Sequence, residues 1–97
     1  MNYAPNEPMI RRAEIPSTEL QGETVLLSLE EQSYFGLRGT SQRIWQLLAQ
    51  PCTQEQILDV LVTEYEVDRA QCERDITTFL QKLWEVHLIV PASSAAH

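Results

Sequence analysis

The sequence is short of the residues from which most enzyme and metal sites are built. It has three glycines, all isolated from one another, which excludes a glycine-rich loop that would hold phosphates. Its two cysteines, Cys52 and Cys72, have no CxxC partner, and its two histidines, His87 and His97, lie far from them, so no paired zinc ligands exist. A cysteine or serine nucleophile would also need a positioned base, which nothing in this pattern supplies. We therefore expect no catalytic activity, no bound metal and no cofactor.

Positive charge and long apolar runs are also scarce. Seven Lys and Arg residues oppose fourteen Asp and Glu residues, which gives a net charge of -7. A field of this sign repels nucleic-acid phosphates and anionic lipid surfaces. No apolar run approaches the roughly 20 residues of a membrane-spanning helix, and the N-terminus lacks the parts of a signal peptide. We expect a cytoplasmic monomer, with its cysteines free, that binds neither nucleic acid nor a membrane.

What the sequence does contain is the composition of one small globular domain. Hydrophobic residues make up 43% of the chain, and Leu, Ile and Val recur through its middle. Residues 1–8 and 91–97 lack periodicity and are rich in Pro, Ala, Ser and Asn, as is typical of flexible tails. The folded domain is expected over residues 9–90, with room for one core and no second lobe.

The first third of this domain shows the short period of β-strands. The expected strands are Met9–Ile15, Glu23–Leu29 and Ser33–Leu37. A turn at Gln21–Glu23 precedes the second strand, and the polar loop Glu30–Gln32 is short enough to form a hairpin into the third. This pattern predicts a three-stranded antiparallel meander.

After Gly39 the period becomes helical. A first helix, with Trp45 as its core anchor, is expected to end before Pro51. Thr53 begins a capping-box pattern for a second helix, and Asp68 can cap a third. A three-stranded sheet needs a partner for its apolar face, so the prediction is an α+β fold resembling a winged helix-turn-helix, with an N-terminal three-stranded antiparallel sheet followed by three helices.

Winged helices can bind DNA, but the charges of the third predicted helix argue against that function. Its three basic residues are offset by three acidic ones: Arg69, Arg74 and Lys82 against Glu73, Asp75 and Glu85. The helix therefore lacks the basic stripe of an element that enters a DNA groove. DNA binding is kept as the less favoured alternative.

The third predicted strand has an open edge, because it is the last strand of the meander. Such an edge can accept an extended peptide as an added strand. Gly36 would let a partner backbone come close, or would instead form a bulge or bend before the helix, and both interpretations stay open. Tyr34 and Phe35 point to opposite faces, so one should join the core while the other is free to line a groove.

Four segments, taken in order, resemble the PqqD family of peptide-modification chaperones, also called RiPP recognition elements. They are Val25–Leu29, Ser33–Leu37, Ile44–Leu48 and Cys72–Leu83. Within the family, the free-standing leader-binding proteins of lasso-peptide biosynthesis are the most similar, and the pyrroloquinoline-quinone form is the alternative. The chain departs from the common pattern at His87, where relatives often have Gly as a helix stop, so the end of the third helix stays open.

The resemblance implies a mechanism and partners. The leader of a ribosomally made precursor peptide would add as an antiparallel strand to the third strand, in a cleft whose other wall is the third helix. In lasso systems the enzyme partners would be a cysteine leader peptidase and an ATP-dependent cyclase; in the alternative pathway the partner would be a radical SAM enzyme. Carried over to this sequence, the peptide-binding residues are Tyr34, Phe35, Gly36 and Leu37 on the strand and Asp75, Thr78, Phe79 and Lys82 on the helix.

Overall fold

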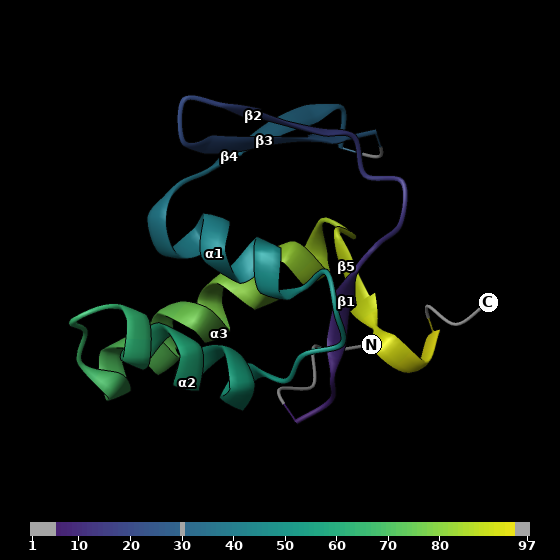
Figure 1. Ribbon diagram of the computed structural model, residues 1–97. Coiled ribbons are helices and arrows are strands. Elements are labelled where there is room, and N and C mark those ends of the chain that lie inside the picture. The colour runs from purple at the N-terminus through teal and green to yellow at the C-terminus, as the bar shows by residue number, and fades with distance from the viewer. Residues whose placement is uncertain (1–5, 30, 95–97) are drawn as a thin grey trace.

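The fold pairs a small sheet with a three-helix layer, and the predicted α+β class is confirmed. The computed structural model describes residues 6–29 and 31–94. Figure 1 shows the three-stranded sheet lying above the helices, while a second, two-stranded sheet brings the two ends of the described chain together. Within this described part, no helix combines the length and apolar character needed to cross a membrane.

The larger sheet is antiparallel, with the order β2-β3-β4. Its strands are β2 (Ser17–Leu20), β3 (Glu23–Ser28) and β4 (Ser33–Leu37). β2 and β3 are joined by the two residues Gln21 and Gly22, which have φ angles of 50° and 81°. Two successive positive φ angles define a type I′ turn, whose twist matches that of the strands it connects. The predicted turn before β3 is thus confirmed.

The prediction that Met9–Ile15 forms the first strand of the meander is wrong. Only Met9–Arg11 is a strand, β1, and it pairs with β5 (Ile89–Pro91) in the separate sheet. The meander is completed instead by β2, all of whose residues are exposed, so no apolar alternation marks it in the sequence. Met9 is buried, and the apolar pattern around it reflects packing beside the helices.

Regular structure continues past residue 90. Pro91, which the sequence analysis assigns to the C-terminal tail, is the last residue of β5. A short 3-10 helix, η1 (Ala92–Ser94), follows, and the Ala92 N–H donates to the Pro8 carbonyl at 2.9 Å. Residues 1–5 and 95–97 of the predicted tails lie outside the described residues.

The three helices begin where the sequence signals predict. They are α1 (Gly39–Leu47), α2 (Gln54–Glu64) and α3 (Arg69–Glu85). At the start of α2, Thr53 Oγ1 accepts from the Gln56 N–H at 3.2 Å, and Gln56 Oε1 accepts from the Thr53 N–H at 2.8 Å. At the start of α3, the Asp68 carboxylate accepts from the Gln71 N–H at 2.9 Å. Both caps satisfy helix donors that would otherwise lack partners.

One apolar core joins the sheet to the helices. Leu26, in the middle of β3, is fully buried, and Leu37 at the end of β4 is nearly so. Trp45, the predicted core anchor, is 3% exposed. The Arg11 guanidinium carbon lies 5.4 Å from the Trp45 ring centroid, in a cation–π contact that covers the ring from the β1 side.

The third helix ends in a Schellman motif that uses a histidine. His87 adopts a φ of 61°, in the left-handed region where glycine is usual. The Leu88 N–H donates to the Leu83 carbonyl at 2.9 Å, and the His87 N–H donates to the Trp84 carbonyl at 3.1 Å. Helix α3 therefore ends one turn before β5, and the absence of the family's glycine does not extend it.

Replacing His87 by glycine should stabilise the protein. A residue other than glycine in the left-handed region costs about 1–2 kcal/mol. Glycine avoids this cost but loses more backbone entropy on folding, so His87→Gly should raise the free energy of unfolding by about 0.5–1 kcal/mol. Urea denaturation measures the change. The matched control is Glu85→Gly in the last turn of α3, which should destabilise by about 0.5–1 kcal/mol. Equal destabilisation by both changes would contradict the strain at His87.

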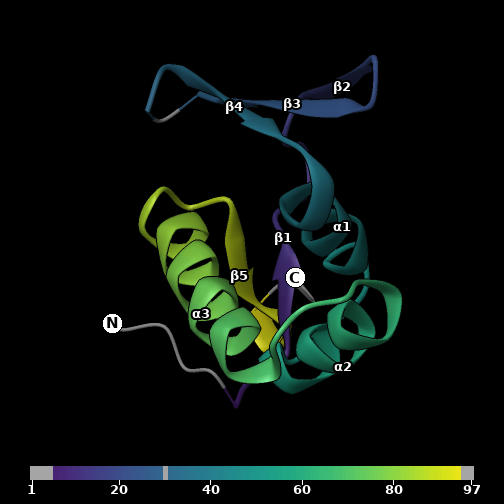
Figure 2. The ribbon, with the colours of Figure 1, turned by 90° about the vertical axis from the view of Figure 1, so that its left-hand side faces the viewer.

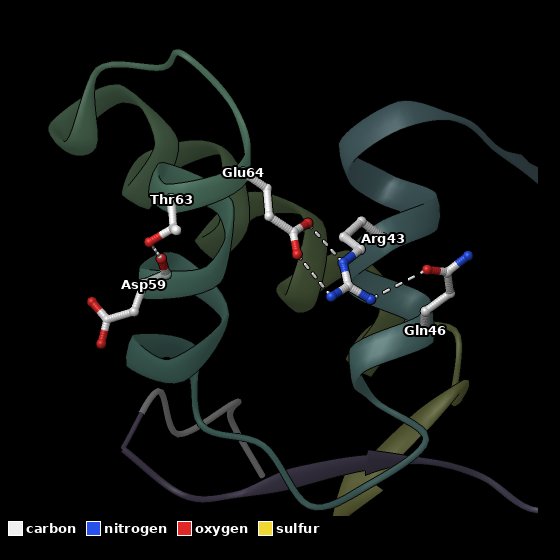
Figure 3. Close-up of polar contacts among 5 residues, drawn as sticks. All are labelled: Arg43, Gln46, Asp59, Thr63 and Glu64. Carbon is white, nitrogen blue, oxygen red and sulfur yellow. Dashed lines mark hydrogen bonds and ion pairs between the residues drawn. The ribbon is translucent and has the colours of Figure 1, made fainter.

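A bidentate ion pair ties α1 to α2 (Figure 3). Arg43 Nε and Nη2 donate to the two carboxylate oxygens of Glu64 at 2.8 and 2.9 Å. Arg43 Nη1 also donates to Gln46 Oε1 at 3.4 Å, within α1. The hydrogen bond from Arg43 is the largest cause that holds the pKa of Glu64 below its usual value of 4.5. The charged form of Glu64 therefore favours the folded state.

This ion pair should make the free energy of unfolding fall at acid pH. Because the folded-state pKa of Glu64 is lowered, its contribution is complete above pH 4.5 and is lost as the pH falls through the folded-state value. Glu64→Gln should therefore be less stable than the natural protein at neutral pH, with the difference shrinking once the pH is well below 4.5. Urea denaturation at both pH values tests this. Glu66→Gln, in the loop after α2, is the control for the loss of one carboxylate and should cost less stability at neutral pH than Glu64→Gln.

Candidate functional site

The hydrogen bonds of β3 determine which backbone groups β4 leaves free. The Leu27 N–H donates to the Pro16 carbonyl at 2.9 Å, so Leu27 points its backbone groups toward β2. In an antiparallel strand these groups alternate from side to side, so the neighbouring Leu26 points toward β4, where its partner is Phe35. Phe35 therefore points its N–H and C=O toward β3.

The same alternation turns the backbone of Tyr34 and Gly36 outward. Both residues neighbour Phe35, so their N–H and C=O groups face the far edge of β4. Within residues 6–29 and 31–94, no strand pairs with that edge. β4 thus presents two sets of donors and acceptors at the spacing that an added antiparallel strand uses.

The side chains of β4 alternate in the same way. Phe35 is half-buried against the core and Leu37 is buried, whereas Tyr34 is 74% exposed on the outer face. The expectation that one of the two aromatic residues joins the core and the other stays free is confirmed. Of the four predicted strand residues, the structure places Tyr34 and Gly36 at the open edge and uses Leu37 as a core residue.

Gly36 lies in β4 without disturbing the ladder. The register between β3 and β4 is continuous, with Gly36 opposite Val25, so Gly36 forms no bulge. A Cβ atom built at Gly36 would collide with the carboxylate of Glu23, which lies across it. Arg38 holds that carboxylate, with Nε and Nη2 both 2.8 Å from Glu23 Oε2. The continuous ladder excludes the bulge, and the close approach of a partner backbone at Gly36 stays a prediction.

A cleft of about 320 Å³ opens among the three helices on the side where β4 passes into α1. Figure 2 views the molecule from this side, with α3 and α1 standing on opposite sides below the sheet. The cleft's apolar wall comes from α1, α2, the loop after α2, and α3: Ile44, Leu61, Val67, Cys72, Ile76 and Phe79. Its rim is polar, so the cleft suits an apolar side chain carried on a solvated backbone.

The predicted helix residues divide into two pairs around this cleft. Asp75 and Phe79 line it, and Phe79 also packs on the core. Thr78 and Lys82 lie exposed on α3 outside the lining. Sequence reasoning missed Val67, which is 41% exposed at the cleft mouth; its signal is an apolar residue in the polar loop just before the α3 cap.

The cysteine that lines the cleft, Cys72, is not activated. Burial is the largest cause that raises the pKa of the Cys72 thiol, and the Asp75 carboxylate raises it further. Burial likewise raises the pKa of Cys52. Both thiols therefore stay protonated at neutral pH and act as small apolar residues. Among the described residues, His, Cys, Asp and Glu form no group of three or more that could hold a metal ion. The arrangement is suited to binding.

Comparison with known proteins gives a consistent result. The family model described as coenzyme PQQ synthesis protein D (PqqD) matches residues 23–89. The solved structure "TbiB1 in Complex with the TbiA(beta) Leader Peptide" is similar with a TM-score of 0.73 and 38% identity, over 82% of this chain and 93% of that one. "Lasso peptide synthetase B1 complexed with the leader peptide" is similar with a TM-score of 0.73 and 30% identity, over 87% of this chain and 99% of that one. Among curated proteins, no match is found.

The matched range runs from the start of β3 into β5, so it contains the open edge of β4 and all three helices that form the cleft. The two similar structures extend the match over nearly their whole length at 30% identity or more. This chain belongs to the PqqD family.

Proposed function

We propose that this protein binds the leader segment of a ribosomally synthesised precursor peptide and presents it to separate lasso-peptide processing enzymes. The leader adds as an antiparallel strand to the free edge of β4, and its apolar side chains enter the cleft beside α3. The protein itself acts as a recognition element with no reaction of its own, in the cytoplasm where such precursors are made.

The observation that carries the proposal is the outward-facing backbone of Tyr34 and Gly36 on the strand that leads into α1, whose first turn lines the apolar cleft. Main-chain hydrogen bonds along an open edge supply affinity for any extended peptide, and pockets for alternate side chains supply specificity. Two similar proteins with the same fold have been solved with leader peptides bound, which supports this kind of occupant.

The proposal also names the enzymes that receive the leader. One of the similar structures is described as a lasso peptide synthetase B1 with its leader peptide, which favours a cysteine leader peptidase and an ATP-dependent cyclase as partners. The family description favours the alternative, presentation to a radical SAM enzyme in cofactor biosynthesis. Genes for a peptidase and cyclase beside this gene support the first pathway, and a gene for a radical enzyme supports the second.

Gly36→Pro should weaken leader binding about tenfold or more. Proline removes the N–H that faces the edge, a hydrogen bond of about 1 kcal/mol, and adds a ring where the leader backbone must approach. The measurement is fluorescence anisotropy, with a labelled synthetic leader of the precursor encoded beside this gene. The Gly36 N–H points away from β3, so no bond of the existing ladder is lost and the thermal unfolding midpoint checks the fold.

Gly36→Ala is the matched control for this variant. It adds the same Cβ next to the Glu23 carboxylate but keeps the edge N–H, so it should cost much less affinity than Gly36→Pro. Equal affinity of Gly36→Pro and the natural protein for the leader would show that the peptide does not bind along β4.

Leader binding should also be visible residue by residue. Backbone amide shifts on titration of the same synthetic leader should concentrate in residues 33–37 and 74–82, because these segments border the added strand. Two-dimensional NMR of the labelled protein provides the measurement. Shifts confined to α2 or to the chain ends would place the peptide elsewhere and overturn the assignment of this site.

A further inference from the structure

Two carboxylates that line the cleft, seven residues apart along α3, have no ion-pair partner among the described residues. Asp68 and Asp75 both line it. Each accepts a hydrogen bond from Gln71, Asp68 from the backbone N–H and Asp75 from the side-chain amide, both at 2.9 Å. No ion pair joins either carboxylate to another of residues 6–29 and 31–94. The first half of α3 thus presents to the cleft two carboxylates without ion-pair partners in the described chain, Asp68 at its cap and Asp75 near its middle.

The next positive charge along α3 is Lys82. It lies seven residues after Asp75, about 10 Å further along the helix and close to the same face. Lys82 is exposed, and its side-chain ammonium makes no hydrogen bond or ion pair within the described part of the chain. The other cations of α3 already have partners: Arg69 pairs with Asp59, and Arg74 donates to the side-chain oxygen of Gln71. The wall formed by α3 thus changes from negative to positive along its length.

The cleft and a neighbouring pocket fix the direction of β4 relative to this charge order. The first turn of α1, which directly follows β4, shares the cleft with the first half of α3. The end of β3, which pairs with the start of β4, shares a second pocket with Val86, His87 and Leu88 after α3. β4 and α3 therefore run in opposite directions. A strand added antiparallel to β4 runs in the same direction as α3.

We propose that this charge order selects leaders with a basic residue followed by an acidic one. The inference rests on the proposed function and adds a specificity rule to it. The basic side chain lies near Asp75, towards the N-terminal end of the bound strand, and the acidic side chain lies near Lys82, towards its C-terminal end. A leader with the opposite order places like charges together at both ends.

Strand geometry gives the spacing of the two charges. About 10 Å along α3 corresponds to about three residues of an extended strand, at roughly 3.3 Å per residue. Side chains on one face of a strand are an even number of residues apart. The acidic residue should therefore follow the basic one at a spacing of about two or four residues.

A display experiment tests this rule without assuming a particular leader. The probe is a library of random peptides of about twelve residues, long enough to span β4 and its flanks at about 3.3 Å per residue. The library is selected separately on the natural protein and on the double variant Asp75→Lys, Lys82→Glu. Both positions are exposed on α3, so the fold should persist, and the circular dichroism of the variant checks it.

Peptides selected on the natural protein should be enriched in the order basic then acidic, and the double variant should select the reverse order. For one selected peptide, exchanging its two charges should weaken binding to the natural protein about tenfold, because each exposed pair contributes up to about 1 kcal/mol. High salt should reduce this difference. Glu73→Lys, on the same helix but outside the cleft lining, is the control and should leave the selected order unchanged.

The outcomes separate the inference from the function on which it rests. The inference alone would be overturned if the selected peptides compete at the β4 edge but show no charge order or the reverse order. It would also be overturned if the double variant selects the same order as the natural protein. Failure to select any peptide that binds at β4 would overturn the proposed function itself. Enrichment of the expected order, with inversion on the double variant, supports both.

Discussion

The site depends on one geometric constraint, the two-residue period that side chains and backbone groups share in an antiparallel strand. In β4, the residues whose side chains face the core are also the ones whose backbone groups bond to β3. Phe35 and Leu37 have both properties. Tyr34 and Gly36 face away from the core, and their backbone groups point away from β3. A slip of one residue would bury Gly36 and expose the Leu37 side chain, so the core itself maintains the open edge.

Two features hold the strand in this register. The type I′ turn at Gln21 and Gly22 fixes the pairing of β2 with β3, and the fully buried Leu26 fixes which face of β3 meets the helices. β4 follows from β3 through the continuous ladder. The Arg38–Glu23 pair adds a contact across the outer face of Gly36, where no side chain could fit without moving it. Contacts made elsewhere in the sheet therefore hold the open edge of β4 in position.

The sequence predicted the elements whose signals are local. Thr53 and Asp68 cap their helices as expected, and β4 is found with its predicted bounds. It could not reveal β1 pairing with β5, because those strands lie at opposite ends of the chain, nor β2, whose residues are all exposed. The cleft was hidden for a related reason: Ile44 and Leu61 belong to separate core-facing stripes, and only helix packing brings them to one wall.

An open strand edge is also a liability, because it can pair with the same edge of another copy. This chain limits that risk in ways consistent with leader recognition. β4 is only five residues long, and the net charge of -7 makes two copies repel each other over roughly the ~10 Å reach of electrostatics in dilute salt. A peptide with a basic residue approaches the same surface without that penalty. The acidity that argues against nucleic acid as a partner therefore also favours a peptide over a second copy at β4.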